Sequence, residues 1–381
     1  MSTSGRGLAA LLALVLCFSM LSGCSPAEQP EGPGTGWEPT HSMELEFATQ
    51  FAVDYYDGGY KLITLADDSR FLVIPEGGEL PQGTADDIVP LYQPLENIYL
   101  AASAAMCLFD ALGRIDAITL SATEEDGWYI ENARLAMQEG RIAFAGKYSE
   151  PDYELLLDRG CPLAVESMMI GHASEVKEKL EELGIAVLVD QSSLESHPLG
   201  RTEWIRLYGA LLNEEEKADA LFQEQVDYLQ SVLDSEDTGK TAAFFYISSS
   251  GSVVARKSGD YVSKMIELAG GHYVFDDLGD PETATSTATI EMEAFFTAAK
   301  DADYIFYNST IGGELKTLDD LLAKSELLGE FKAVQNGNVW CTAQNMYQET
   351  TRLGQMVQSF HKIFSGEADE LDELPFFYRL H

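Results

Sequence analysis

Short apolar runs alternate with amphipathic stretches along most of this chain. Residues 55–77 have the pattern of a strand, a turn and a strand, which predicts a β-hairpin or meander near the start. In the first half that follows, we expect strands at 116–120, 141–146, 161–167 and 185–190, with helices at 129–140, 152–160 and 174–184 between them. Short strands that alternate with helices favour a parallel sheet built from β-α-β units.

The same alternation stops at residue 192 and resumes at residue 241. In the second half, we expect strands at 242–248, 272–275, 303–309 and 336–342, with helices at 260–271, 290–302, 318–329 and 352–366. The two halves resemble each other, because 154–167 and 294–309 both have a helix, a polar turn and a strand. The pattern therefore predicts an α/β protein with two Rossmann-like lobes.

Residues 196–233 separate the two halves. Thr202 is placed to cap a short helix, and Asn213 to cap a longer one, with Glu216 completing a capping box. The longer helix carries one apolar stripe, formed by Ala218, Leu221, Phe222, Val226, Leu229 and Leu233. A helix of that length is about 30 Å long and can bridge two lobes. We expect Gln225 on its exposed side, and His197 in the turn that leads into the segment.

The N-terminus has the features of a lipoprotein signal. Arg6 precedes an apolar run from Leu8 to Leu21, which is too short to span a membrane and fits a secretory signal peptide. Small residues then lead into Cys24, as in the bacterial lipobox. We expect Cys24 to be lipidated and to begin a mature chain held on the outer face of the cell membrane. A stretch rich in proline, glycine and glutamate follows, typical of a flexible tether.

Five segments summarise this organisation. They are a signal peptide at 1–23, a tether at 24–43, an N-terminal α/β lobe at 44–212, a bridging helix at 213–235 and a C-terminal α/β lobe at 236–381.

Composition narrows the function. A formal net charge of -39 makes nucleic acid a poor partner, because phosphate binding needs clustered Lys and Arg. Beyond Cys24, the cysteines are Cys107, Cys161 and Cys341, which form no disulfide framework. The chain has no G-x-S-x-G, no H-E-x-x-H and no G-x-G-x-x-G after a strand. We therefore expect no enzymatic activity and no cofactor.

Four segments carry a family resemblance: 197–222, 255–271, 289–308 and 334–342. Together they resemble the substrate-binding proteins of ABC importers for iron-siderophores and cobalamin. The resemblance implies two lobes joined by a long helix, with a ligand cleft between them. It also implies that the chain captures a metal chelate or corrinoid and delivers it to an ABC permease and its ATPase. We expect the protein to act as a monomer.

Loops at the predicted strand ends supply candidate ligand contacts, because ligands of α/β sheets bind where the strands end. Aromatic and methionine side chains give adaptable apolar contact, and cations can orient an anionic chelate. The candidates are Trp128, Tyr129, Met168, Met169, Arg256, Lys257, Tyr307, Ser309, Thr310, Met346, Tyr347 and Arg352.

Two glutamates are candidates for docking to the permease. In the family that the chain resembles, one glutamate in each lobe contacts arginines of the permease. Glu154 and Glu293 match those positions, and Glu291 is a rival for the second. An acidic residue at a helix start is also favoured by the helix dipole, which explains either residue without docking.

Two alternatives stay open at this point. His172, His197 and His272 each lie near a predicted strand end, so a zinc- or manganese-binding protein is the first alternative. A surface hydrolase on the same scaffold is the second.

Overall fold

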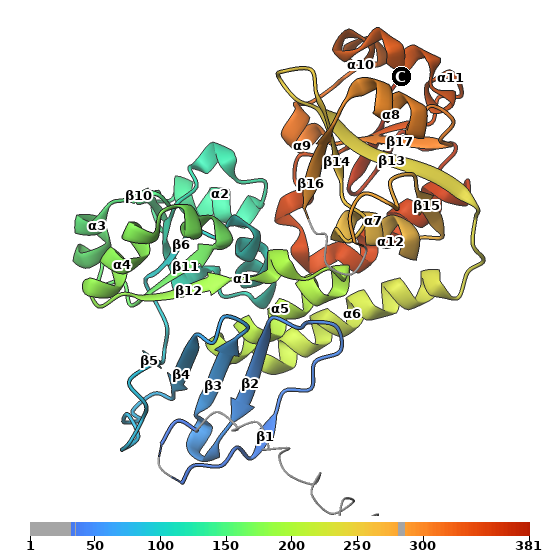
Figure 1. Ribbon diagram of the computed structural model, residues 1–381. Coiled ribbons are helices and arrows are strands. Elements are labelled where there is room, and N and C mark those ends of the chain that lie inside the picture. The colour runs from blue at the N-terminus through green and yellow to red at the C-terminus, as the bar shows by residue number, and fades with distance from the viewer. Residues whose placement is uncertain (1–31, 35, 281–285) are drawn as a thin grey trace, which may run out of the picture.

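The computed structural model describes residues 32–34, 36–280 and 286–381. The predicted signal peptide and Cys24 lie outside these residues. Two α/β lobes stand side by side on a pair of helices, and a separate β-sheet lies on the opposite side of that pair (Figure 1). None of the described helices is long and apolar enough to cross a membrane.

The N-terminal sheet extends the predicted meander to five strands in the order β1-β2-β3-β4-β5. Neighbours are antiparallel except β4 and β5, which are parallel. Its strands are β1 His41–Ser42, β2 Phe51–Tyr55, β3 Lys61–Leu65, β4 Arg70–Ile74 and β5 Ile88–Tyr92.

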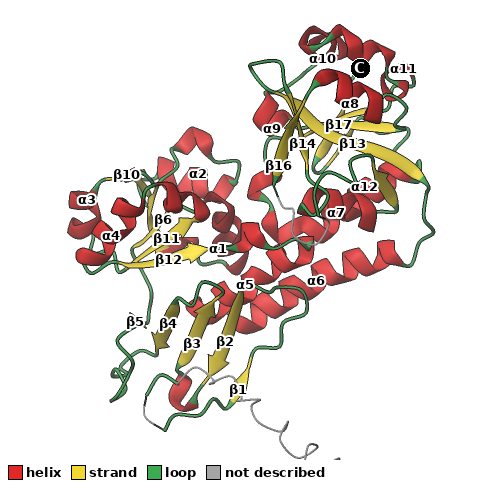
Figure 2. Cartoon of the chain, viewed as in Figure 1, coloured by secondary structure: helices red, strands yellow, loops and turns green. Residues whose placement is uncertain are grey.

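The first lobe has the parallel sheet that its alternating pattern predicts, in the order β12-β11-β6-β7-β8. The strands are β6 Ile98–Leu100, β7 Ile118–Ser121, β8 Ala143–Phe144, β11 Leu163–Ser167 and β12 Ala186–Asp190, with a small pair, β9 Gly146–Lys147 and β10 Glu150–Pro151. Helices flank this sheet (Figure 2). They are α1 Met106–Leu112, α2 Glu131–Gln138, α3 Tyr153–Asp158 and α4 Ser174–Glu182.

The second lobe contains a mixed sheet of eight strands, in which β13, β15, β17 and β18 run parallel. The strands are β13 Lys240–Ile247, β14 Val253–Arg256, β15 Gly271–Tyr273, β16 Thr287–Ile290, β17 Tyr304–Tyr307, β18 Val339–Thr342, β19 Glu373–Leu374 and β20 Phe377–Arg379. The helices are α7 Tyr261–Leu268, α8 Met292–Ala299, α9 Ser309–Gly312, α10 Leu318–Lys324, α11 Lys332–Gln335 and α12 Leu353–Phe364. The two-lobe α/β prediction is confirmed.

Two helices connect the lobes, α5 Pro198–Leu212 and α6 Glu215–Leu233. Every residue of α5 is buried except Arg201 and Arg206. A helix that is apolar on all sides must be enclosed, and α5 contacts α1 of the first lobe, β2 of the N-terminal sheet, and α7 and α12 of the second lobe. The longer α6 packs beside it and reaches α12, which confirms a bridging helix.

The predicted helix caps are wrong. His197 caps α5, since its Nδ1 accepts a hydrogen bond of 3.2 Å from the Leu199 N–H. Thr202 lies inside that helix and donates instead to the Thr350 carbonyl, at 2.9 Å. Asn213 ends α5 in the left-handed conformation, with φ 58°. Its side chain accepts instead from Lys61, which is distant in sequence, at 2.7 Å, and the predicted capping box with Glu216 does not form.

The predicted exposure of Gln225 is also wrong. Gln225 is 5% exposed, and its Oε1 accepts from the Gln355 N–H of α12 at 3.2 Å. The helices approach so closely that a Cβ at Gly354 would lie 2.2 Å from the Gln225 carbonyl oxygen. The apolar stripe marks the packed face of α6 at Ala218, Phe222 and Leu229, but its last residue, Leu233, is 49% exposed. The partner helix α12 also covers a wider arc of α6 than the stripe suggests.

Two buried glutamates attach the N-terminal sheet to α5. The Glu203 carboxylate accepts the backbone N–H groups of Glu46, Phe47 and Ala48 at 2.7 to 2.9 Å. Glu195 accepts those of Thr49 and Gln50. Five consecutive donors at the entry to β2 are thereby satisfied by two carboxylates. Hydrogen bonds to a charged acceptor are stronger than those between neutral groups.

We expect Glu203→Ala to lower the free energy of unfolding by about 3 kcal/mol, because it leaves one buried and two partly buried N–H groups without their acceptor. Urea denaturation would measure the change. The matched control is Glu224→Ala, an exposed glutamate on α6, which should change stability by less than about 0.5 kcal/mol. Equal midpoints for both variants would contradict this anchoring role.

Glu166 on β11 is a buried acid of a different kind. Its side chain is fully buried, and neither carboxylate oxygen has a hydrogen-bond partner among the described residues. Burial disfavours the charged form and raises the pKa of Glu166 to about 8. The folded protein therefore holds this side chain neutral at pH 7.

This raised pKa predicts a stability that falls with rising pH. The folded state keeps the proton up to about pH 8, whereas an unfolded glutamate loses it near pH 4.3. The contribution is full below the unfolded pKa and is lost as pH rises through the folded pKa, for a total on the order of a few kcal/mol. Glu166→Gln should flatten the decline between pH 5.5 and 9, measured by urea denaturation. Exposed Glu178→Gln serves as control, and a wild-type slope in the Glu166→Gln protein would refute the neutral acid.

Candidate functional site

Loops from both lobes meet above α5, at the carboxyl ends of the parallel strands. In the first lobe, β7 leads into the turn Glu125–Gly127, and β6 leads into Ser103–Ala105. In the second lobe, β18 leads into the turns Met346–Gln348 and Thr350–Arg352. Turn Ser103–Ala105 contacts Met346–Gln348, and α1 contacts Thr350–Arg352. We call this meeting of loops the interlobe junction.

Arg256 forms the centre of a buried polar cluster beside the junction. Its guanidinium lies 3.4 Å from Asp260, the residue that caps α7, and donates to the Tyr347 hydroxyl. Asn308, at the end of β17, also donates to that hydroxyl, at 2.7 Å. The buried Asn308 Oδ1 has no partner among the described residues. The cluster thus draws residues from β14, α7, β17 and the loop after β18.

A second guanidinium approaches the cluster from α5. Arg201 lies 3.7 Å above the centre of the Tyr261 ring and donates to the carbonyls of Ser193 and Glu195. Burial lowers the pKa of Arg201. Burial acts in the same sense on Arg256, but Tyr347 and Asp260 outweigh it and raise the pKa of Arg256. Both guanidinium groups stay charged at neutral pH, since an arginine side chain is not deprotonated in proteins.

The cluster places two cations close together. Among the described residues, Asp260 is the one carboxylate within ion-pair range of either guanidinium. The buried carboxylates of Glu195 and Asp190 act on Arg201 from further away, so the charges of the wider region offset one another. Two neighbouring guanidinium groups with a single close ion pair still favour a bound anion, since charges interact strongly away from water.

The predicted ligand contacts have different surroundings in the structure. Four of them are enclosed side chains, at most 1% exposed: Trp128, Tyr307, Ser309 and Met346. Tyr307 donates to the Gly312 carbonyl at 3.1 Å, and the Ser309 hydroxyl lies 3.0 Å from that of Tyr378. In this conformation these four side chains pack inside a lobe.

Two of the predicted ligand contacts, Tyr129 and Arg256, adjoin the interlobe junction. The Tyr129 ring is 50% exposed, and its backbone N–H donates to the Gln348 side chain at 2.8 Å. Arg256 binds Tyr347, the residue before Gln348. Tyr129 and Arg256 therefore bond to two consecutive residues of one loop, Gln348 and Tyr347. Both were predicted to contact the ligand. Their ligand contact itself stays a prediction.

The remaining candidates are more dispersed. Thr310 bonds Thr342 and the Ala343 carbonyl within the second lobe, and Lys257 is half-buried beside Arg256. Arg352 lies over the Phe376 ring at 4.9 Å and donates to Gln355. Met168 and Met169 are exposed on the first lobe. Met168 lines a separate cavity of about 360 Å³ that faces Gln50 and Asp67 of the N-terminal region.

The candidate docking glutamates are both exposed, each in the first turn of its helix. Glu154 belongs to α3 of the first lobe and Glu293 to α8 of the second. The rival Glu291 precedes α8 as its N-terminal cap residue. These placements leave both glutamates free to meet a partner, and docking stays a prediction.

Sequence reasoning missed five residues of this site: Arg201, Asp260, Tyr261, Asn308 and Gln348. Arg201 lies in the segment 196–233, which the sequence pattern favours as a structural connection between the two halves. Asp260 at the start of a predicted helix had the signature of a cap, which it is. No local signal could connect Asn308 or Gln348 to the site, because their partners are distant in sequence.

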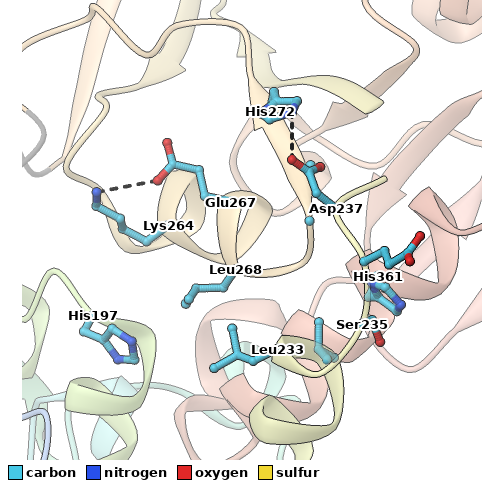
Figure 3. Close-up of a pocket in the computed structure, with 13 residues that line it drawn as sticks. His197, Leu233, Ser235, Asp237, Lys264, Glu267, Leu268, His272 and His361 are labelled. Atoms are coloured by element: carbon cyan, nitrogen blue, oxygen red, sulfur yellow. Dashed lines mark ion pairs between the residues drawn. The ribbon is translucent and has the colours of Figure 1, made fainter. Parts of the chain in front are cut away.

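Three histidines line a cavity of about 600 Å³ between the second lobe, the start of α5 and the end of α6 (Figure 3). His272 lies 3.4 Å from Asp237, and the Nδ1 of His361 lies 3.0 Å from the Ala269 carbonyl. His197 caps α5 and stacks on Phe47, and burial lowers its pKa to about 4.

This cavity does not match a metal centre or the expected ligand crevice. In Figure 3 the three histidines come from different elements and do not converge on a point. Within the described part of the chain, no three His, Cys, Asp or Glu residues are placed to hold a metal ion. Gly271 and His272 pair with the first residues of β13, so the cavity lies at the amino ends of the strands. Ligands of α/β sheets bind at the opposite edge.

Similar proteins include a lipoprotein of Methanocaldococcus jannaschii. It is named an uncharacterized lipoprotein and is 26% identical over 331 residues, which cover 80% of this chain and 77% of the relative. This similarity spans nearly the whole molecule, including sequence outside the second lobe.

Solved structures share the fold. The periplasmic heme binding protein HutB of Vibrio cholerae has a TM-score of 0.56 and 20% identity, covering 69% of this chain and 98% of that one. An ABC-type Fe3+-hydroxamate transport protein of Saccharomonospora viridis has a TM-score of 0.55 and 20% identity, covering 71% and 93%. The vitamin B12 binding protein BtuF of V. cholerae has a TM-score of 0.51 and 18% identity, covering 71% and 97%.

The family model described as "Periplasmic binding protein" matches residues 141–345, more than half of the chain. That range extends from just after α2 through α5, α6 and most of the second lobe, and it includes Arg201, Arg256 and Asp260 of the cluster but ends before Tyr347. The two lobes, the bridging helices and this match together show that the chain belongs to the periplasmic binding protein family.

Proposed function

We propose that this protein is an extracytoplasmic solute-binding lipoprotein that captures an anionic metal chelate, of the iron-siderophore or corrinoid class, for an ABC transporter. The solved structures that share its fold include proteins named for heme, Fe3+-hydroxamate and vitamin B12. The chain binds and releases its ligand without chemical change, and the metal arrives as part of that ligand.

The pair of guanidinium groups beside the interlobe junction is the observation that carries this proposal. Arg256 pairs with Asp260, and Arg201 lies over the ring of the next residue, Tyr261. A guanidinium presents several donors in a fixed plane and suits carboxylate or hydroxamate oxygens. The exposed Tyr129 ring offers an apolar surface on the facing lobe. The described cleft residues thus combine a cation and an aromatic surface.

The transporter partners are an ABC permease and its ATPase. Glu154 and Glu293 are exposed, one on each lobe, and can contact basic residues of a permease at the same time. Such contacts would be sensitive to salt, because exposed charges are screened over about 10 Å at 0.1 M ionic strength. The protein docks as a monomer.

A zinc- or manganese-binding protein is the second candidate function. Of the three histidines that would favour it, His272 lies 3.4 Å from Asp237, His197 caps α5, and His172 is exposed on the first lobe. A surface hydrolase draws no support from any observed nucleophile and base. Capture of a metal chelate is therefore the function to test first.

The test is a titration of the purified protein with heme, a ferric hydroxamate, cyanocobalamin and bare Zn2+, followed by absorbance and tryptophan fluorescence. We expect one chelate to bind with saturation and to be recovered unchanged. Arg256→Met should weaken that binding at least about tenfold, because a charge-assisted hydrogen bond contributes about 1.5–3 kcal/mol. Tight Zn2+ binding without chelate binding would replace this proposal with the metal-ion function.

Arg141→Met is the matched control for this variant. Arg141 is an exposed arginine paired with Glu139 on the first lobe, distant from the junction. It should bind the chelate as the wild type does. Thermal melts of both variants identify any loss of folded protein, since Arg256→Met also leaves Asp260 without its cation. Equal affinities of the two variants would remove Arg256 from the site.

The lipid anchor has its own test. Cys24 lies in the predicted lipobox and outside the described residues, so the expectation rests on sequence. We expect Cys24→Ala to release the protein from the membrane fraction into the soluble extracytoplasmic fraction, measured by fractionation and immunoblotting. Cys107→Ala is the control, since Cys107 is a buried free thiol. A Cys24→Ala protein that stays in the membrane fraction would exclude lipidation at this cysteine as its anchor.

A further inference from the structure

Gln348 joins the two lobes through its side-chain amide. Its Oε1 accepts the Tyr129 N–H at 2.8 Å, and its Nε2 donates to the Gly127 carbonyl at 2.8 Å. Both partners belong to the loop after β7 of the first lobe, more than 200 positions away in sequence. The side-chain amide therefore makes one accepted and one donated hydrogen bond with the backbone, as a residue of a neighbouring β-strand does.

The chemistry of this contact is specific to an amide. The Gln348 oxygen must accept from the Tyr129 N–H, and its NH2 group must donate to the Gly127 carbonyl. A flipped amide would place the NH2 group against the N–H and the oxygen against the carbonyl. A carboxylate has no donor for Gly127, and an apolar side chain offers neither group. Asparagine carries the same amide on a side chain shorter by one methylene.

The loops on both sides of the contact are held by further interactions within their own lobes. The Gln348 N–H donates to the Asn345 carbonyl at 2.8 Å, and the Asn345 side chain donates to Glu349 at 2.9 Å. On the first lobe, Trp128 lies between the two paired residues and its ring is 1% exposed. An anchored tryptophan on one side and a closed turn on the other leave the amide little freedom. The contact therefore transmits position from one lobe to the other.

We propose that Gln348 is a positioning residue: its amide clasps the lobes together and holds Tyr129 facing the Arg256 cluster for ligand capture. This inference rests on the proposed function. The residue before it, Tyr347, binds Arg256, so one short loop connects the cation of the second lobe to the aromatic ring of the first. Gln348 sets their spacing, and ligand affinity depends on that spacing.

Hydrogen exchange tests the clasp directly, because the Tyr129 N–H is the donor in the contact. We expect Gln348→Met to speed exchange of that amide at least about tenfold, read by mass spectrometry of peptides that contain Tyr129. The matched control is Gln138→Met. Gln138 donates to Glu125 at 2.6 Å, so it holds the same loop, but within the first lobe. Unchanged exchange in Gln348→Met would overturn the proposal.

Binding of the chelate that the wild type takes up, whether heme, ferric hydroxamate or cyanocobalamin, tests the positioning role. Gln348→Met should weaken it about tenfold, which corresponds to about 1.4 kcal/mol, while Gln138→Met should match the wild type. Faster exchange with unaltered affinity would overturn the positioning role. If none of these chelates binds the wild type, the proposed function fails, and the exchange experiment still decides the clasp.

Gln348→Glu should restore protection of the Tyr129 amide at low pH, which a general structural defect would not do. At pH 8 the carboxylate can still accept from the Tyr129 N–H but repels the Gly127 carbonyl, so Gln348→Glu should protect Tyr129 less than the wild type does. A protonated carboxyl has one donor and one acceptor, as the amide has. Towards pH 5, after correction for intrinsic exchange, Gln348→Glu should therefore protect Tyr129 better than Gln348→Met. Identical behaviour of the two variants at both pH values would contradict the two-point contact.

Discussion

The enclosure of α5 is the constraint on which the arrangement of the whole molecule depends. A helix with buried residues on every side cannot leave its surroundings without exposing apolar surface, at about 25 cal/mol for each Å². The N-terminal sheet, α1, α6, α7 and α12 all contact it. Each lobe is thus built against the same helix, and the positions of the lobes relative to one another follow from how each packs on α5.

Polar residues on and next to α5 determine the orientation in which the surrounding elements pack against it. On α5, Glu203 holds the entry to β2, Thr202 holds the turn after β18, and Arg201 reaches the first residue of α7. Just before the helix, Glu195 also holds the entry to β2. Hydrophobic burial is not directional, whereas these hydrogen bonds are lost when an element rotates. The apolar faces therefore supply most of the stability, and the polar residues select one orientation. A junction held in this way favours small movements of the lobes over wide opening.

The sequence predicts the repeating units well and the site only in part. Alternating strands and helices identify both lobes, because each unit is local and its apolar spacing is strong. The caps at Thr202 and Asn213 failed, since a local pattern cannot show that Thr350 and Lys61 will satisfy those side chains. The predicted exposure of Gln225 failed for a related reason, because its burial depends on α12.

The site shows the same limit more sharply. Arg256 and Tyr347 could be named because a cation and an aromatic residue stand out near predicted strand ends. Their partners could not, since Asn308 and Gln348 are ordinary polar residues until the fold places them beside a tyrosine hydroxyl and a backbone pair. A glutamate such as Glu203 gives even less signal, because its acceptors face backbone N–H groups that every residue except proline carries.

The N-terminal sheet adds a geometric condition to capture and delivery. It lies on the side of α5 and α6 away from the two lobes (Figure 1), and the Thr84 hydroxyl bonds the Pro33 carbonyl at 2.6 Å. Nine residue steps separate Cys24 from Pro33, a reach of at most about 30 Å. If Cys24 carries the lipid, the sheet stays close to the membrane, whereas α3 and α8, with the candidate docking glutamates, lie on the lobes. Docking to a permease in the same membrane then requires the molecule to turn about its short tether, so the tether's length limits which permease surfaces the two glutamates can reach together.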